Sequence, residues 1–283
     1  MEERIQRFKI PTDDDARLWR YMRMNRFNSM LVTGSAYFCR LDRLEDQFES
    51  ALSPRALDAA VEELAREGVA RCLLPAGVDP YDAAYLATGS GDALDRASIF
   101  VNCWQKNPHE SWAMWKQFAR DGVAIRSTVG RLVDSFNPEG TAPRVFPGEV
   151  EYIDHETDEM LCPFPWLYKN HMFGWEQEVR AWTVQKPREH SIVGFNEDHP
   201  EGLNIRVDLS VLVDGVVVLP GSNEETRQNV QILLAENGLP DKPVLASAAD
   251  TIPEYRQYHN LNRQSLLEMG IDFPIHRDEE ESD

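Results

Sequence analysis

Candidate strands and helices follow one another irregularly along this chain, which restricts the folds it can adopt. A doubly wound fold needs a repeated strand–helix–strand rhythm, whereas irregular mixing is typical of an α+β protein. We therefore predict an α+β fold with a mainly antiparallel mixed sheet, flanking helices and a helical insertion. Apolar and β-branched runs predict strands over 17–22, 36–41, 98–105, 122–128, 149–154, 176–184, 203–209, 215–219 and 243–247. Apolar spacing predicts helices over 24–33, 110–120, 129–136, 165–175 and 224–238.

The chain has no Pro-, Gly- or Ser-rich linker and no internal repeat, so nothing in it marks a domain boundary. We expect a single α+β domain over residues 1–250. Pro54 begins a helical pattern, and residues 50–96 are the predicted helical insertion. Residues 251–283 are expected to form a C-terminal extension, helical over 253–269 and ending in a disordered acidic tail.

The chain carries 48 acidic and 29 basic residues, which gives a net charge of -19. Such a surface repels duplex nucleic acid, although a local basic cleft can still hold an anionic ligand. No apolar run approaches the ~18 residues of a membrane span, and the first residues do not resemble a secretory signal. Cys39, Cys72, Cys103 and Cys162 are widely spaced, as reduced thiols in the cytosol are. We expect a cytoplasmic protein with no membrane partner and no metal cofactor.

The strongest candidate for a functional site is the segment Glu176-Gln-Glu178-Val-Arg180. Side chains two residues apart on a strand project from the same face, so this segment would place two carboxylates beside one guanidinium. Repulsion between the carboxylates would raise the proton affinity of one of them, and Arg180 would counter that effect. The face is either functional or a plain charged edge of the sheet, and the sequence favours neither.

Two further strands carry candidate binding residues. Arg20 lies between aromatic residues and is able to hold a phosphate or carboxylate bidentately, but it is also compatible with a surface arginine packed on its neighbours. Ser127 and Thr128 end the strand 122–128, where their hydroxyls either bind a ligand or cap the next helix. On spacing alone, the structural role is the more frequent one in each case.

Aromatic residues lie close to these positions. Trp104 follows Cys103, and the segment 110–115, Glu-Ser-Trp-Ala-Met-Trp, opens a predicted helix with an aromatic face. Such rings either stack on a planar ligand or belong to the core. Glu110 and Ser111 are placed to cap that helix, a role at least as frequent as a functional one.

The order of these motifs resembles a bacterial family designated as a domain of unknown function, number 2971. The resemblance covers roughly residues 18–248, and it rests on Trp-Arg20-Tyr, Ala-Tyr37-Phe, Cys-Trp104, the segments 110–115 and 122–128, and Glu176-x-Glu178-x-Arg180. It also includes the acidic turn 46–49, where the family usually has Pro and this chain has Gln47. The family carries no assigned function.

A second, weaker resemblance is to the Arg–Ser–Glu type of ADP-ribosyltransferase, in which a first-strand Arg, a Ser-Thr-Ser strand and a late Glu-x-Glu occur in this order. The middle motif departs from that pattern, because this chain has Arg-Ser127-Thr128. The resemblance implies NAD as a substrate, with Arg20 on the pyrophosphate and Ser127 and Thr128 bracing the site.

The same resemblance implies that Glu178 stabilises the oxocarbenium-like centre and that Glu176 activates the acceptor, a protein or nucleic acid that the sequence does not identify. Tyr37 or Trp104 would stack on nicotinamide, and Arg180 would belong to the binding face. The hypothesis requires Arg20, Ser127 and Glu178 to meet in one cleft. Placement of Arg20 and Glu178 on opposite faces of the sheet would exclude it.

Two other classes of function stay open. Asp46, Glu49, Glu110, Glu176 and Glu178 are possible Mg²⁺ ligands, so a metal-dependent hydrolase is one alternative. A non-catalytic sensor or interaction domain, in phage defence or a toxin pair, is the other, and it predicts an exposed aromatic patch without a polar cleft. The leading prediction is an enzyme acting on a nucleotide-like small molecule, with ADP-ribosyl transfer as its most specific form.

Overall fold

A computed structural model describes residues 10–44, 46, 93–136, 143–158, 164–185 and 200–250. Its centre is a nine-stranded mixed sheet in which only β10 and β11 pair in parallel, so the predicted α+β class with a mainly antiparallel sheet is confirmed. Strands run β11-β10-β4-β1-β3-β2-β9, and β8 joins β3 to β5. The strands are β1 (Arg17–Arg23), β2 (Ser35–Arg40), β3 (Ile99–Lys106), β4 (Gly122–Thr128), β5 (Phe146–Glu149), β8 (Glu178–Val184), β9 (Gly202–Arg206), β10 (Gly215–Val218) and β11 (Val244–Leu245).

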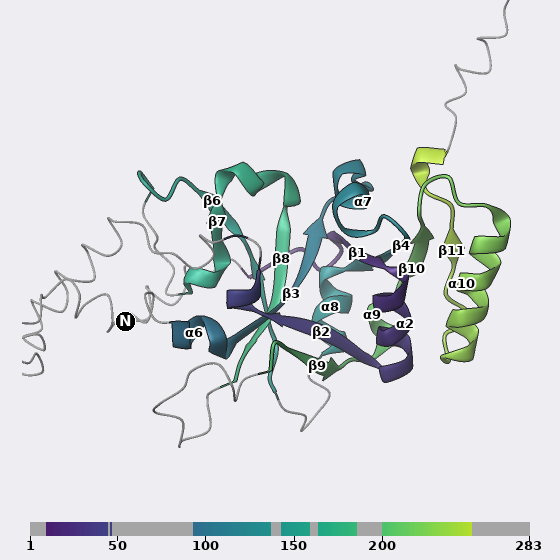
Figure 1. The fold of residues 1–283 in the computed structure, drawn as a ribbon, viewed down its shortest axis with the longest axis horizontal. Coiled ribbons are helices and arrows are strands. Elements are labelled where there is room, and N and C mark those ends of the chain that lie inside the picture. Colours follow the sequence, from purple (N-terminus) through teal and green to yellow (C-terminus); the bar gives the residue numbers. More distant parts are fainter. Residues whose placement is uncertain are drawn as a thin grey trace, which may run out of the picture.

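The helices cover both faces of this sheet. A separate parallel pair, β6 (Glu151–Ile153) with β7 (Tyr168–Asn170), lies at the end of the molecule opposite β11 and α10 (Figure 1). The α-helices are α2 (Met24–Thr33), α6 (Ala93–Ser98), α7 (Trp112–Phe118), α8 (Val129–Ser135), α9 (Leu209–Leu212) and α10 (Glu224–Glu236). The 3₁₀ helices are η1 (Leu41–Arg43), η2 (Pro165–Leu167), η3 (His171–Glu176) and η4 (Ala248–Asp250).

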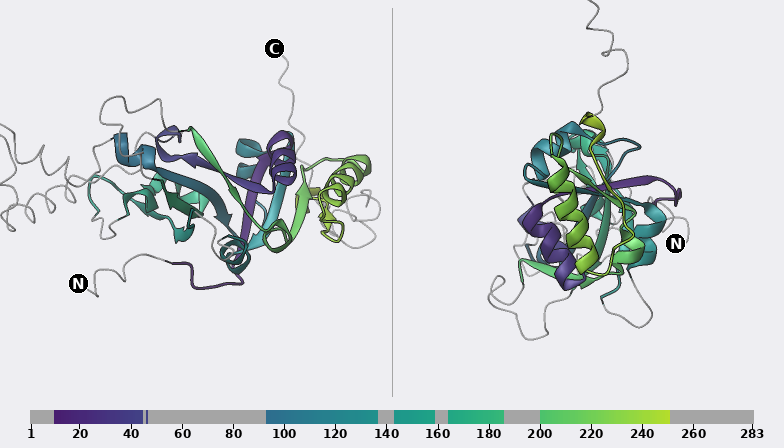
Figure 2. Two further views of the ribbon diagram at one scale, coloured as in Figure 1. Left: turned by 90° about the horizontal axis from the view of Figure 1, so that it is seen from below. Right: turned by 90° about the vertical axis from the view of Figure 1, so that its right-hand side faces the viewer.

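The main core lies on the face of the sheet covered by α2, α8, α9 and α10. Phe27 of α2, Leu132 of α8, Leu212 of α9 and Leu234 of α10 are buried there against alternate residues of the strands. Figure 2 shows α10 lying beside the strands at the β10–β11 edge. Because successive strand residues point to opposite faces, this core uses every second residue of each central strand.

The opposite face carries two smaller clusters. Helix α7 packs Met114 and Trp115 onto Trp19 and Tyr21 of β1, with an edge-to-face contact between Tyr21 and Trp115 at 5.1 Å. Near β8, Trp182 packs among the aromatic residues that precede β7. The predicted aromatic face of α7 is therefore only partly internal, since Trp112 and Phe118 stay 57% and 40% exposed.

Local signals explain most element boundaries. Helix α2 ends at Gly34, whose left-handed backbone (φ 58°) lets its N–H donate to the carbonyls of Met30 and Leu31. Asp208 caps α9 by accepting from the N–H groups of Ser210 and Val211, so the predicted strand 203–209 ends earlier, at Arg206. No helix in the described part of the chain is long and apolar enough to cross a membrane.

Two predicted elements are corrected by the structure. The segment 165–175, predicted as one helix, folds as η2, the strand β7 and η3, because β7 gains backbone pairing with β6. The predicted strand 149–154 is divided between β5 and β6, because the chain pairs with β8 up to Val150 and with β7 from Glu151 onward. The predicted insertion 50–96 and extension 251–283 lie mostly or wholly outside the described residues.

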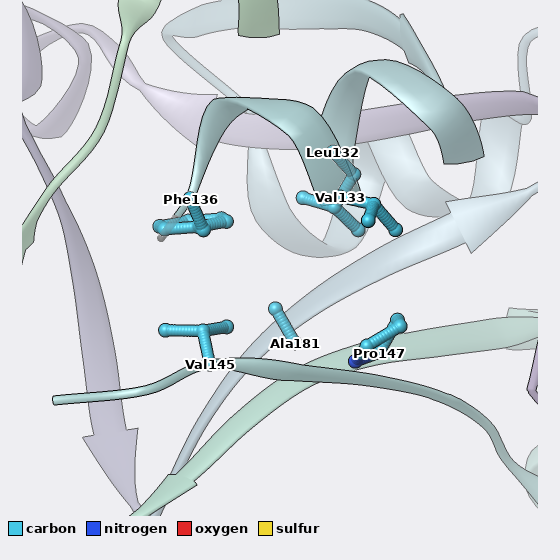
Figure 3. Close-up of a pocket in the computed structure, with 6 residues that line it drawn as sticks. All are labelled: Leu132, Val133, Phe136, Val145, Pro147 and Ala181. Atoms are coloured by element: carbon cyan, nitrogen blue, oxygen red, sulfur yellow. The ribbon is translucent and has the colours of Figure 1, made fainter. Parts of the chain in front are cut away.

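A small apolar cavity of about 20 Å³ lies between α8 and the strands β5 and β8. Figure 3 shows Leu132, Val133 and Phe136 facing Val145, Pro147 and Ala181 across it. Its lining has no polar side chain, and Val133 in this lining is 40% exposed, so it is a small apolar pocket at the edge of the core.

Candidate functional site: a cleft at a split in the sheet

The central sheet is split along one edge of β3. On one side β3 pairs with β8 from Ile99 to Gln105. On the other side it meets β2 only at residues 100 and 101, and β1 only at residues 105 and 106. The residues in between, 102–104, therefore face a gap in which β1 and β2 diverge.

Two polar side chains fill the gap and replace the missing backbone ladder. Arg20 donates from Nη1 to the carbonyl of Cys103 (3.3 Å) and from Nη2 to the carbonyl of Tyr37 (3.4 Å). Asn102 donates from Nδ2 to the same Tyr37 carbonyl (2.8 Å), and its Oδ1 accepts from the indole N–H of Trp104 (2.7 Å). Carbonyl groups that the split leaves without strand partners are satisfied in this way.

A cleft of about 850 Å³ opens at this split. Its volume is in the range of small-molecule sites. It is lined by residues of β1, α2, β2, β3, α7, β7, η3 and β8, which are far apart in the sequence. Of the predicted site residues, it collects Arg20, Tyr37, Trp104, Glu176, Glu178 and Arg180.

One end of the cleft is a buried ionic network on β8. Arg180 binds Glu178 bidentately, with Nε 2.8 Å from Oε1 and Nη2 2.9 Å from Oε2, and it donates from Nη1 to the carbonyl of Trp166 at 2.6 Å. Both charged side chains are almost wholly buried. Their spacing of two residues on one strand produces this geometry, as the predicted common face requires.

Lys169 of β7 links this pair to Glu176. Its Nζ lies 2.7 Å from Oε2 of Glu176 and 3.7 Å from Oε2 of Glu178, and it also faces the ring of Phe173 at 4.7 Å. Lys169 was not among the predicted site residues, because its segment was predicted to be helical. Its position depends on the pairing of β6 with β7, a contact that no local pattern encodes.

Glu176 reaches the network from η3, and the prediction that β8 begins at residue 176 is wrong. Gln177 adopts a left-handed backbone conformation (φ 44°, ψ 56°) that ends η3, and β8 starts at Glu178. A non-glycine residue in this region is uncommon and carries a conformational cost. Here the turn lets both Glu176 and Glu178 face Lys169.

The two carboxyl groups have opposite pKa shifts. Burial disfavours the carboxylate of Glu178, but the charge and hydrogen bonds of Arg180 outweigh burial and hold the pKa of Glu178 well below its usual value. For Glu176, burial prevails over the charge of Lys169, so the pKa of Glu176 is raised. One carboxylate is thus kept ionised while its neighbour binds a proton more readily.

Cys103 joins the same network from β3. Burial, followed by the negative charge of Glu178, raises the pKa of the Cys103 thiol well above the ordinary value. The thiol therefore stays protonated at neutral pH and is a poor nucleophile in this state.

Aromatic rings border the cleft. The ring of Tyr37 is 44% exposed and packs over Gly202 of β9, where an added Cβ would lie 2.3 Å from the ring. Trp175 and Phe118 also line the cleft and are 44% and 40% exposed. Trp104 is only 2% exposed and its ring faces the Arg20 guanidinium at 5.8 Å, so Tyr37 offers a planar ligand far more surface than Trp104 does.

Ser127 and Thr128 lie away from the cleft. Ser127 is fully buried, and its hydroxyl donates to the carbonyl of Leu212 at 2.6 Å. The Thr128 hydroxyl accepts from the N–H of Arg131 and caps α8. Both residues have the structural role that their spacing favoured, and neither is in position to brace a ligand.

Arg20 and Glu178 line one cleft but project from opposite faces of the sheet. Leu18 and Met22, two residues to either side of Arg20, belong to the main core, as does Val179, the neighbour of Glu178. Strand alternation therefore directs Arg20 to the main-core side and Glu178 to the other. Both reach the cleft because the sheet is open between them. With Ser127 also outside the cleft, this placement excludes the Arg–Ser–Glu arrangement that the resemblance implied.

Glu110 and Ser111 are structural. Glu110 accepts from the indole N–H of Trp115 (3.0 Å), from the hydroxyl of Ser247 (2.6 Å) and from the N–H of Ala248 (2.8 Å). Ser111 caps α7. Glu49 lies outside the described residues, and within them no three His, Cys, Asp or Glu side chains group as metal ligands.

Comparison with known proteins identifies no relative. No family model, curated protein or solved structure matches this chain. The resemblances drawn from the motifs therefore stay predictions, and the function is argued from the cleft alone.

Proposed function

We propose that the cleft at the split binds a nucleotide-like ligand and that Glu176 and Glu178 carry its chemistry. Because Arg20 and Glu178 project from opposite faces and Ser127 lies outside the cleft, the Arg–Ser–Glu arrangement is excluded. Cleavage of the nicotinamide bond of NAD is therefore proposed on the two carboxyl groups alone. The observation that supports this most is the pair of carboxyl groups with opposite pKa shifts at one end of a cleft lined by aromatic rings. Neighbouring groups whose pKa values are driven apart are typical of sites that divide acid–base and charge-stabilising roles.

In this proposal the two carboxylates act on the bond between the ribose and the nicotinamide nitrogen. That bond breaks with its electron pair going to nicotinamide, and the ionised Glu178 stabilises the positive charge that develops on the ribose. A nucleophilic acceptor then forms a new bond to the same ribose carbon with its own lone pair. Glu176, with its raised proton affinity, takes the proton that the acceptor loses.

The aromatic residues fit the planar part of such a ligand. The ring of Tyr37 packs against Gly202 on one side and is 44% exposed, so this packing limits its movement while leaving ring surface for a ligand. A ring positioned in advance loses little conformational entropy on stacking. The proposal no longer depends on Ser127 and Thr128, which lie outside the cleft, and it leaves Trp104 a supporting role beneath Arg20.

The test is release of nicotinamide from NAD by the purified protein, with and without cell lysate as a source of acceptor. We expect release by the wild type, and at least a 100-fold loss in Glu176→Gln, the size typical of removing a general base. Glu224→Gln is the matched control, because Glu224 is an exposed glutamate of α10 that pairs only with Arg227 of its own helix. Release that survives Glu176→Gln unchanged would contradict the assigned role.

Two outcomes would redirect the proposal. Binding of NAD without release would indicate a non-catalytic sensor that uses the same cleft. Absence of both binding and release, together with stabilisation by Mg²⁺ or Mn²⁺ in a thermal shift assay, would favour the metal-dependent alternative.

A further inference from the structure

The cations of the cleft divide into those with a carboxylate partner and those without. Arg180 and Lys169 are paired with Glu178 and Glu176, and Arg43 lies 3.6 Å from Glu201. Arg20 of β1 and Arg26 of α2 also line the cleft, but in the part of the chain that the structure describes neither forms an ion pair. In a chain with a net charge of -19, two neighbouring arginines without a carboxylate are unexpected unless something else supplies the negative charge.

We propose that Arg20 and Arg26 form an anion-binding subsite for the phosphate or diphosphate group of the ligand. This inference deepens the proposed function, since it names the part of a nucleotide that the second end of the cleft would hold. Arg26 was not among the residues that the sequence singled out.

The geometry of Arg20 leaves it free to bind an anion. Its two contacts with backbone carbonyls, at 3.3 and 3.4 Å, use one donor from each terminal nitrogen, and a guanidinium has further N–H donors in the same plane. Those contacts and the ring of Trp104 fix the side chain in place. A guanidinium held in this way is suited to bidentate recognition of phosphate oxygens.

Arg26 supplies the second cation, from α2. It lies in the first turn of this helix, a turn with no acidic residue, and its side chain is exposed and lines the cleft. Burial lowers the pKa of Arg20 to about 10, and the charge of Arg26 acts in the same direction. A bound anion would offset the repulsion between the two positive charges.

Small polar groups lie in the same cleft. Ser29 of α2 and Asn204 of β9 line it, and their side chains are able to donate to further phosphate oxygens. The ionic network of β8 is at the other end, already neutralised by its own pairs. The cleft thus offers unpaired positive charge only where β1 and α2 meet, as far as the described residues go.

The test is binding of inorganic pyrophosphate to the full chain by calorimetry, at an ionic strength held constant with potassium chloride. We expect wild-type binding that Arg26→Gln weakens roughly 10-fold or more, the effect of losing one charge-assisted contact. Arg23→Gln is the matched control. Arg23 is an exposed arginine three residues away that does not line the cleft and lies 3.9 Å from Asp121, and its substitution is expected to leave binding unchanged.

A second variant guards against indirect effects. Arg20→Lys keeps the charge but loses the planar fork, so we expect weaker binding with a melting temperature measured in parallel to show that the protein is folded. No pyrophosphate binding by the wild type, or equal binding by the wild type and Arg26→Gln, would overturn the subsite. An equal loss in Arg26→Gln and Arg23→Gln would show only general charge attraction and would also overturn it.

The same measurements separate this inference from the proposed function. Pyrophosphate binding that depends on Arg26, without any release of nicotinamide from NAD, would support the subsite and reject the transferase reaction. Release of nicotinamide that depends on Glu176 but not on Arg26, with no pyrophosphate binding, would support the reaction and reject the subsite.

Discussion

The two ends of the cleft hold their charges in different ways. At the β8 end, Glu178, Lys169 and Arg180 are buried, Glu176 is mostly buried, and the four form a closed network of ion pairs. At the end formed by β1 and α2, Arg20 is only partly buried, Arg26 is exposed, and neither has a carboxylate partner among the described residues. The closed network therefore contributes to folding before any ligand arrives, whereas Arg20 and Arg26 are available to bind a ligand.

Because of this difference, substitutions at the two ends should reduce the free energy of unfolding by different amounts. Removing one member of a buried pair leaves an uncompensated charge in a low-dielectric environment, which strongly destabilises the fold. Removing an exposed, unpaired cation leaves nothing unsatisfied, so its effect on stability is small and its effect on binding is specific. Variants at the β8 end should therefore change mainly stability, and variants at Arg20 or Arg26 mainly ligand binding.

The largest expected effect is at Arg180. Arg180→Gln leaves the Glu178 carboxylate buried without its bidentate partner, and we expect the free energy of unfolding to fall by about 3–5 kcal/mol. Urea unfolding followed by circular dichroism measures this loss. Arg26→Gln, at the open end, is expected to change the same quantity by less than about 0.5 kcal/mol. Similar losses in the two variants would remove the distinction between the ends.

The next prediction concerns how stability depends on pH, which should differ in sign between Glu178 and Glu176. Because the folded-state pKa of Glu178 is lowered, its contribution to stability is present above the unfolded pKa and is lost as pH falls through the folded pKa. The stability gap between the wild type and Glu178→Gln should therefore be wide at pH 7 and shrink at acidic pH. Unfolding measured from pH 7 down to the lowest pH at which both proteins stay folded tests this.

Glu176 should show the opposite sign. Its folded-state pKa is raised, so ionisation costs the folded state more than the unfolded one, and the stabilising effect of protonation is lost as pH rises. Relative to the wild type, Glu176→Gln should gain stability as pH increases through the folded pKa. If the stability of the two glutamine variants, relative to the wild type, changed with pH in the same direction, the pKa shifts of the two carboxyl groups would not be opposite. That result would contradict the assigned roles.

The sequence predicts the elements of the fold that depend on local residue patterns, and it predicts the candidate site only in part. The range of β4 agrees with the prediction, and α2 ends at Gly34 as its sequence indicates. By contrast, β5 contains Pro147 and Gly148, and it is a strand only because it pairs with β8. Period-two spacing correctly placed Glu178 beside Arg180.

Other parts of the site depend on contacts between distant segments. Lys169 reaches Glu176 only because β6 and β7 pair, and Arg26 reaches the cleft only because α2 packs between β1 and β2. Nothing near these residues in the sequence indicates such neighbours. Ser127 shows the converse: its motif matched a site, but the fold buries it against α9.

A smaller effect is expected at helix α7, which also lines the cleft. Helix α7 contributes Met114, Gln117 and Phe118 to the cleft, and Glu110 ties the start of this helix to Ser247. Ser247→Ala removes the hydrogen bond to the Glu110 carboxylate and also the acceptor of the Ala249 N–H. We expect the free energy of unfolding to fall by about 1.5–3 kcal/mol. Ser222→Ala is the control, since Ser222 lies in the turn before α10 and its hydroxyl forms no hydrogen bond with the described residues. A loss no larger than that of the control would show that α7 is held by its apolar contacts alone.

The smallest effect concerns the face of β8 that points away from the ionic network. Ala181 follows Arg180 directly, yet strand alternation places it in the main core, where it lines the apolar cavity beside Val145 (Figure 3). Ala181→Val fills part of that cavity with a residue suited to strands, and we expect a gain of about 0.5–1 kcal/mol in the free energy of unfolding. Thermal and urea unfolding measure it, with Ala181→Gly as the opposite change. A gain here beside a large loss at Arg180 would show that β8 tolerates substitution and that the network alone accounts for the loss. A destabilised Ala181→Val would instead mean that the cavity is too narrow and that β8 is sensitive on both faces.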